Sequence, residues 1–163
     1  MNVAAPAKQQ TNGCGSLSTS GVVMGFDYGR RRIGIAIGQT LTGTASALET
    51  LNARDGKPDW DRVTEIIAQW QPQAVVVGIP CHLDGSLSDI SREAERFARQ
   101  LEGRYKLAVY REDERLSSRE AESIVAKKRS AGQMKQKAAD TDRLAAQIIL
   151  QAWLDRGRRR STQ

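Results

Sequence analysis

The fold is decided by Val22-Val23-Met24-Gly25-Phe26-Asp27, followed after a short turn by Ile33-Gly34-Ile35-Ala36-Ile37-Gly38. The first run is short and apolar, which is typical of a buried strand. The second alternates large and small residues with a period of two, which predicts a strand that pairs back on the first. The intervening residues 28–32 read Tyr-Gly-Arg-Arg-Arg and predict a turn. An antiparallel hairpin is therefore expected at the start of the folded domain.

Beyond this hairpin the pattern changes to strands that alternate with helices. Strands are predicted over 43–51, 74–79 and 107–110, and helices over 60–70 (with Asp59 as N-cap), 88–102, around Ala121 to Val125, and 140–155. Successive strands imply antiparallel pairing, whereas the later alternation implies parallel crossovers. The predicted fold class is α/β, with a mixed five-stranded sheet flanked by helices.

The length and composition indicate one domain. A chain of 163 residues suits a single α/β unit. Residues 1–20 lack periodicity and predict a disordered leader, 21–156 the folded domain, and 157–163 a basic C-terminal tail. Two distant cysteines fit a reducing compartment, and the apolar runs are too short to span a membrane, so a cytoplasmic protein is expected.

Positive charge is concentrated in clusters. The formal net charge is +6, and such clusters attract polyanions, of which phosphate backbones are the commonest. The alternative is a basic surface that is merely solvated. The residues predicted to bind nucleic acid are Arg30, Arg31, Arg32, Arg115, Lys127, Lys128, Arg129, Lys135 and Lys137, and further arginines end the chain.

Acidic residues occur where an apolar pattern would not predict them. Asp27 ends a buried strand, and the glycines and alanine of the next strand would let a backbone, a phosphate or a metal approach closely. Asp142 shares a helical stripe with Ala145, Ala146, Ile149 and Trp153, which predicts that it points toward the core or a cleft. Simpler alternatives are that Asp27 caps the turn and that Asp142 lies in a first helical turn favoured by the helix dipole.

A third acidic position follows the strand predicted over 107–110. Glu112, Asp113 and Glu114 stand together there, and Arg115 could hold a carboxylate or a phosphate with both its nitrogens. An isolated cluster of this kind can also be a solvated loop. His82 is the only histidine, so no catalytic group of serine or cysteine with histidine can be built around another histidine. Acids within a basic protein suit hard divalent cations and phosphodiester chemistry.

Four motifs in order resemble the YqgF/RuvX family. They are Gly25-Phe26-Asp27-Tyr28-Gly29 with Arg32 to Ala36, Val77 to Pro80 with Asp84-Gly85, Asp113 to Ser118, and Asp142 to Ala146 continuing through Ile148 to Gln151. The resemblance implies a ribonuclease H-like fold and a nuclease that matures the 5′ end of pre-16S ribosomal RNA. Holliday-junction resolution is the earlier proposal for this family.

By motif, the resemblance implies that Asp27, Glu114 and Asp142 are the catalytic and metal-binding acids, with Mg²⁺ or Mn²⁺ as cofactor and two ions expected. Asp113 remains an alternative to Glu114. Many members of the wider superfamily place an acid on the central strand, and the strand over 74–79 has none, so either the Asp113-Glu114-Arg115 segment supplies this acid or the site has fewer ligands.

Three other functions are compatible with the sequence. One is a resolvase of branched DNA with the same acids, which should be a dimer; a monomer or weak homodimer is expected otherwise. Another is an RNA-binding module without catalysis. The last is an actin-like nucleotide-binding protein, which usually needs two such domains where this chain has one.

Overall fold

The computed structural model describes residues 21–80, 88–113 and 137–161. Several predicted features lie outside these ranges. They are the leader over 1–20, the helix around Ala121 to Val125, and the residues Glu114, Arg115, Lys127, Lys128, Arg129 and Lys135. Lys137 begins the last helix, but its side chain lies outside the part that the structure describes.

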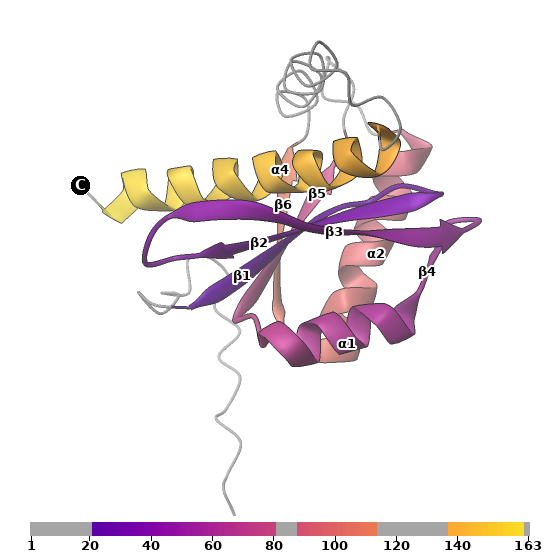
Figure 1. Ribbon diagram of the computed structural model, residues 1–163, viewed down its shortest axis with the longest axis horizontal. Coiled ribbons are helices and arrows are strands. Elements are labelled where there is room, and N and C mark those ends of the chain that lie inside the picture. Colours follow the sequence, from indigo (N-terminus) through magenta and orange to yellow (C-terminus); the bar gives the residue numbers. More distant parts are fainter. Residues whose placement is uncertain (1–20, 81–87, 114–136, 162–163) are drawn as a thin grey trace, which may run out of the picture.

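A mixed sheet forms the centre of the molecule (Figure 1). Its strands lie in the order β4-β3-β2-β1-β5-β6. Their bounds are Val22–Asp27 for β1, Arg32–Gln39 for β2, Thr44–Arg54 for β3, Lys57–Pro58 for β4, Ala74–Ile79 for β5 and Ala108–Asp113 for β6. The five longer strands are those predicted from the sequence. The two-residue β4 is an addition at the edge.

The pairing directions confirm the prediction from strand order. β1 pairs antiparallel with β2, and β2 pairs antiparallel with β3. β5 pairs in parallel with β1 and with β6. The register aligns Asp27 with Gly78 and Gly78 with Glu112. The carboxyl ends of the three parallel strands therefore meet at one edge of the sheet, which is where open α/β sheets place their ligand sites.

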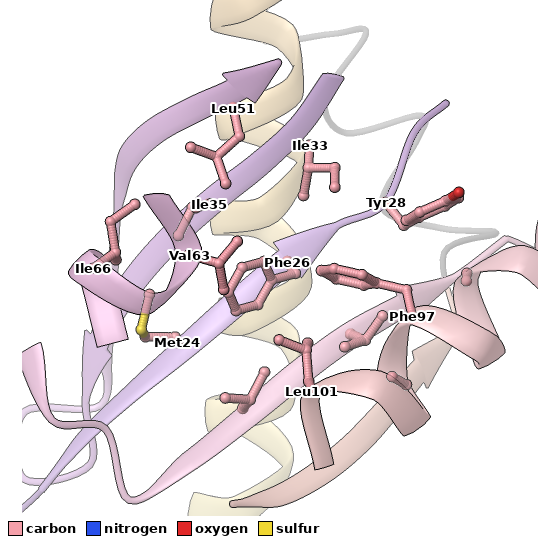
Figure 2. Close-up of a cluster of buried hydrophobic side chains, with 14 of the residues drawn as sticks. Met24, Phe26, Tyr28, Ile33, Ile35, Leu51, Val63, Ile66, Phe97 and Leu101 are labelled. Carbon is pink, nitrogen blue, oxygen red and sulfur yellow. The ribbon is translucent and has the colours of Figure 1, made fainter. Parts of the chain in front are cut away.

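Helices α1 (Trp60–Trp70) and α2 (Asp89–Tyr105) cover one face of the sheet. Phe26 on β1 meets Phe97 on α2 edge to face, with 5.6 Å between the ring centroids. Figure 2 shows these rings within a cluster that also takes in Ile33, Val63 and Leu101. Burial of this kind contributes about 1.5–3 kcal/mol for each large side chain, so this layer fixes β1 against α2.

Helix α4 (Lys137–Ser161) covers the other face (Figure 1). Its apolar residues pack on the small side chains of β1, β2, β3 and β5, and the buried cluster comprises Val23, Ala36, Ala45, Ala74, Val76, Ala146, Ile149, Leu150 and Leu154. A Cβ at Gly25 would come within 2.8 Å of the Leu150 Cβ. Only a strand with so little side-chain volume admits the helix at this distance.

The helix ends follow local signals. Asp59 caps α1, as predicted, by accepting a hydrogen bond from the Arg62 amide at 3.2 Å. Ser88 and Ser91 form a reciprocal capping box at the start of α2. α4 extends beyond its predicted end at residue 155 and reaches Ser161, so residues 157–161, which the sequence places in the basic tail, are helical.

Candidate active site

Asp27 lies at the end of β1 between two glycines. Its Cα partner on β2 is Gly34, and its Cα partner on β5 is Gly78. The Asp27 side chain is half-buried. Because neither flanking residue has a side chain, the face of the sheet beside this carboxylate is open to whatever packs there.

Asp142 is brought to the same place by α4. A Cβ built on Gly34 would collide with the Asp142 carbonyl oxygen, so the helix backbone lies directly on this glycine. Asp27 is the cross-strand partner of the same glycine. The structure thus brings together two of the three acids predicted from the sequence, although they are 115 positions apart along the chain (142 minus 27). The small residues of β2 were expected to admit a backbone, a phosphate or a metal. At Gly34 it is the backbone of α4 that approaches.

Asp142 also forms an ion pair. The Arg32 Nε donates to the Asp142 Oδ2 at 2.7 Å, and the side chains are 40% and 23% exposed respectively. Arg32 is the first residue of β2 and lies two positions before Gly34, so strand alternation turns both toward α4.

Glu112 and Asp113 belong to β6, so this part of the acidic cluster is not the solvated loop that the sequence left open as an alternative. Glu112 lies within β6, is 5% exposed, and forms an ion pair with Arg156 of α4. Asp113 has the opposite orientation in the strand, and its register partner Ile79 packs in the α1/α2 core. Asp113 is therefore on the face away from Asp27, while Glu114 lies outside the described residues.

The arginine run after Asp27 separates into three environments. Arg30 forms a two-pronged contact with Glu93 of α2, through Nε at 2.9 Å and Nη2 at 2.7 Å to Oε1. Arg31 is exposed, and Arg32 binds Asp142. Two of the three arginines in this run, all of which were predicted to bind nucleic acid, are thus engaged in ion pairs within the protein.

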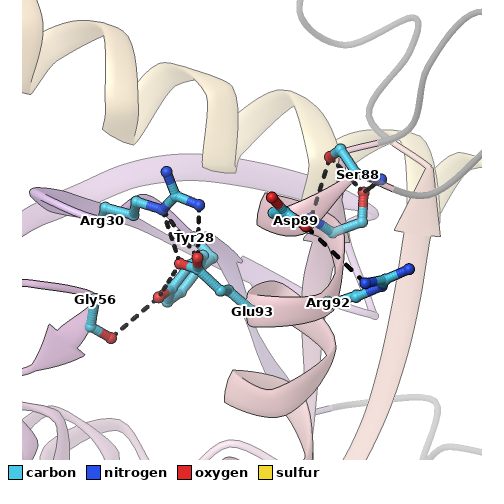
Figure 3. Close-up of polar contacts among 8 residues, drawn as sticks. Tyr28, Arg30, Gly56, Ser88, Asp89, Arg92 and Glu93 are labelled. Carbon is cyan, nitrogen blue, oxygen red and sulfur yellow. Dashed lines mark hydrogen bonds and ion pairs between the residues drawn. The ribbon is translucent and has the colours of Figure 1, made fainter.

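Tyr28 ties the residue next to Asp27 to two other elements (Figure 3). Its hydroxyl donates to the Gly56 carbonyl oxygen at 3.0 Å and lies 3.2 Å from the Glu93 Oε2. Burial, and then the negative charge of Glu93, raise the pKa of Tyr28 above its ordinary value. The hydrogen bond from Arg30 lowers the pKa of Glu93. This network holds the turn after β1 against α2 and the β3–β4 hairpin.

The contacts made by Tyr28, Glu93, Arg156 and the glutamines of α4 were not predicted from the sequence. Gln151 accepts from the Ala45 amide at 3.0 Å and donates to the Gly43 carbonyl oxygen at 2.8 Å. The position of these glutamines on a mostly apolar helix was the one signal in the sequence that could have predicted their hydrogen bonds to the sheet. Nothing local in the sequence could have indicated the Glu93 contact, because its partners Tyr28 and Arg30 are 65 and 63 positions away.

A divalent cation fits the chemistry of this site. Carboxylate oxygens are the ligands that Mg²⁺ and Mn²⁺ prefer. Gly34 lies beside both acids, and its lack of a side chain allows Asp142 to approach Asp27. Within residues 21–80, 88–113 and 137–161, no group of three acidic, histidine or cysteine side chains is assembled. Among the described acids, Asp27 and Asp142 are the two that converge on Gly34, and they would offer carboxylate oxygens to such a cation.

Comparison with known proteins decides the family. The model of the family described as "RuvX: Holliday junction resolvase" matches residues 21–156. The chain belongs to the RuvX family. It is accordingly a nuclease, a hydrolase that acts on phosphodiester bonds.

Several relatives carry the name "Putative pre-16S rRNA nuclease", and two of them illustrate the similarity. The one from Pseudomonas fluorescens SBW25 is 46% identical to this RuvX chain over 136 residues, covering 82% of this chain and 92% of the relative. The one from Pseudomonas putida KT2440 is 44% identical over 135 residues, covering 82% and 94%. Both alignments cover nearly the full length of the relative.

Solved structures show the same fold. Thermus thermophilus RuvC bound to a Holliday junction substrate gives a TM-score of 0.52 at 18% identity, over 84% of this chain and 96% of that one. The fowlpox virus Holliday junction resolvase gives 0.51 at 14% identity, over 83% and 99%. These likenesses establish that this RuvX chain has the ribonuclease H-like fold predicted from its motifs.

In the part of the chain that the structure describes, no helix combines the length and apolar character needed to cross a membrane.

Proposed function

We propose that this RuvX protein is a metal-dependent endonuclease that processes the 5′ end of pre-16S ribosomal RNA. The observation that carries the proposal is the convergence of Asp27 and Asp142 on Gly34, in a chain whose relatives are named for this RNA. Such a substrate would place the protein in the cytoplasm. The positive net charge of +6 suits a polyanionic substrate such as RNA.

The acids of the site have distinct proposed roles. Asp27 and Asp142 offer carboxylate oxygens to Mg²⁺ or Mn²⁺, for which two ions are expected. Glu114 is proposed as the third acid in preference to Asp113, because Asp113 lies on the opposite face of β6. When bound, divalent cations activate water and stabilise the leaving oxygen of a phosphodiester. The network of Tyr28 and Glu93 keeps the turn after Asp27 in place.

The substrate backbone is proposed to lie along the basic residues near the site. Arg31 is exposed in the turn that follows Asp27, where a phosphate can reach its guanidinium. Arg115, Lys127, Lys128, Arg129, Lys135 and Lys137 are proposed as further phosphate-binding residues. Replacing any one of these side chains with a neutral one should weaken RNA binding and reduce its dependence on salt.

A second function is favoured by a specific observation, the description of the matching family as a Holliday junction resolvase. The same acids would then cleave branched DNA. A resolvase cuts two strands symmetrically and needs a dimer, whereas RNA processing is compatible with a monomer or a weak homodimer.

Cleavage of two substrates at equal salt distinguishes these functions. A 5′-extended 16S precursor and a four-way DNA junction are incubated with the protein in Mg²⁺, in Mn²⁺ and in EDTA. We expect site-specific cleavage of the RNA with either metal and none in EDTA. Preferential cleavage of the junction would replace the proposed substrate, and cleavage that persists in EDTA would refute the metal dependence.

A further inference from the structure

The contact between Arg32 and Asp142 joins the two elements that build the site. The Arg32 Nε donates to one carboxylate oxygen, Oδ2, at 2.7 Å. The pair lies next to Gly34, on the face of the sheet where α4 also brings Asp142 toward Asp27. A positive charge therefore already neutralises one of the two described carboxylates of the site.

A guanidinium and a divalent cation would compete for this carboxylate. An oxygen that accepts a short charge-assisted hydrogen bond cannot offer the same lone pair to a metal, and the nearby positive charge opposes a second cation. We infer that Arg32 is the counter-ion of Asp142 in the metal-free protein and must release Oδ2 when a cation binds. This inference rests on the proposed metal-dependent function.

The neighbouring arginines are not arranged for this role. Arg30 is held by both oxygens of Glu93 on α2, on the far side of the turn. Arg31 is exposed. Arg32 is thus the member of the run whose charge is directed at Asp142. It sets how tightly the site takes up a cation, and it is set free for another anion once a cation is bound.

Manganese titration of the full chain, with free Mn²⁺ counted by electron paramagnetic resonance, tests the inference. Arg32→Gln removes the competing charge, and Arg31→Gln is the matched control because it removes the same charge one residue away. Exposed ion pairs contribute modestly, so we expect Arg32→Gln to bind Mn²⁺ about two- to fivefold more tightly than Arg31→Gln. Arg32→Lys, which keeps the charge, should bind Mn²⁺ less tightly than Arg32→Gln.

A second readout uses the wild-type protein and does not depend on the folding of any variant. The Arg32 Nε–H resonance should shift as Mg²⁺ is added, whereas that of Arg30, hydrogen-bonded to Glu93, should stay in place. An unchanged Arg32 resonance at saturating Mg²⁺ would overturn the inference.

Asp27→Asn separates this inference from the function on which it rests. Weaker Mn²⁺ binding in Asp27→Asn, together with equal affinities in Arg32→Gln and Arg31→Gln, would overturn the role of Arg32 and leave the metal site standing. Absence of saturable Mn²⁺ binding in the wild type, or binding that Asp27→Asn leaves unchanged, would overturn both.

Discussion

At the scale of single residues, Gly34 is the position on which the site depends. Its backbone pairs with Asp27 on β1, and the backbone of Asp142 lies on its Cα. A residue with any side chain here would separate the helix from the sheet. Because Gly34 has no Cβ, α4 can lie directly on β2 and place Asp142 beside the strand partner of Asp27.

Gly34→Ala tests this arrangement. The added methyl group would meet the Asp142 and Arg143 backbone, which cannot rotate away, so α4 must shift. We expect the free energy of unfolding in urea to fall by about 1–3 kcal/mol, with nuclease activity falling as well.

The control is Gly103→Ala in α2, where nothing lies within 4 Å of the added Cβ. This change should leave activity unaltered and raise stability by up to about 1 kcal/mol, because alanine is the better helix former. Equal stability and activity in Gly34→Ala and the wild type would show that the contact with α4 does not position the site.

The sequence indicated Asp27 and Asp142 because each acid interrupts an apolar pattern of known period. It could not indicate that Arg32 pairs with Asp142 rather than with a phosphate, because the partner is 110 positions away. Neither the run of charges nor the motif distinguishes an arginine that pairs with a carboxylate of the protein from one that is available to bind a phosphate.

At the scale of elements, α2 holds the turn that follows β1. Glu93 accepts hydrogen bonds from Arg30, and the Tyr28 hydroxyl lies beside the same carboxylate. The aromatic ring of Tyr28 packs 5.4 Å from that of Phe97 on the same helix. The turn after Asp27 is therefore anchored to a helix on the opposite face of the sheet from α4.

Glu93→Gln should lower stability in a pH-dependent way. The pKa of Glu93 is lowered in the folded protein, so its carboxylate stabilises the fold above the ordinary glutamate pKa of about 4.3. This contribution disappears as the pH falls through the lowered value. We expect the variant to melt at a lower temperature than the wild type at pH 7, and the difference to shrink toward pH 3.

Glu95→Gln is a suitable comparison, because Glu95 lies on the same helix and pairs with Arg111 away from this turn. It should affect activity less than Glu93→Gln does. A stability difference for Glu93→Gln that grows on acidification would contradict the role given to the ion pair.

Most elements could be predicted from periodicity, and the deviations have physical reasons. β1, α1 and β5 have the predicted bounds because each ends where an apolar run meets a polar or turn residue. α4 runs past its prediction because its last turns extend beyond the apolar stripe that defined it. β4 was missed because two residues, Lys57 and Pro58, carry no alternation to detect.

At the scale of the whole molecule, the sheet has two different faces. One is sealed by α1, α2 and a layer of aromatic and branched side chains. The other carries small residues and is covered by α4. The carboxyl end of β1 meets the first turns of α4 on this second face, where Asp142 lies on Gly34. Glu112, near the end of β6, faces the same helix but pairs with Arg156 in a later turn.

Position within an apolar strand and an apolar helical stripe singled out Asp27 and Asp142, and the structure places both beside Gly34. Their catalytic and metal-binding roles stay predictions. Glu114 stays a prediction, since it lies outside the described residues. The period of two in a strand already separates Asp113 from its two neighbours in the sequence, and the register adds that Asp113 lies on the face away from Asp27.

The central claim is that Asp27 and Asp142 act together on one phosphodiester. Its most direct test is the rate of pre-16S RNA cleavage in Mg²⁺ by Asp27→Asn and Asp142→Asn, with Asp155→Asn, an exposed carboxylate on the same helix as Asp142, as control. Removing even a group that supports a metal ligand costs about 10- to 100-fold, so each of the two variants should lose at least that much while the control stays at wild-type rate. Cleavage at wild-type rate by either Asp27→Asn or Asp142→Asn would contradict the account.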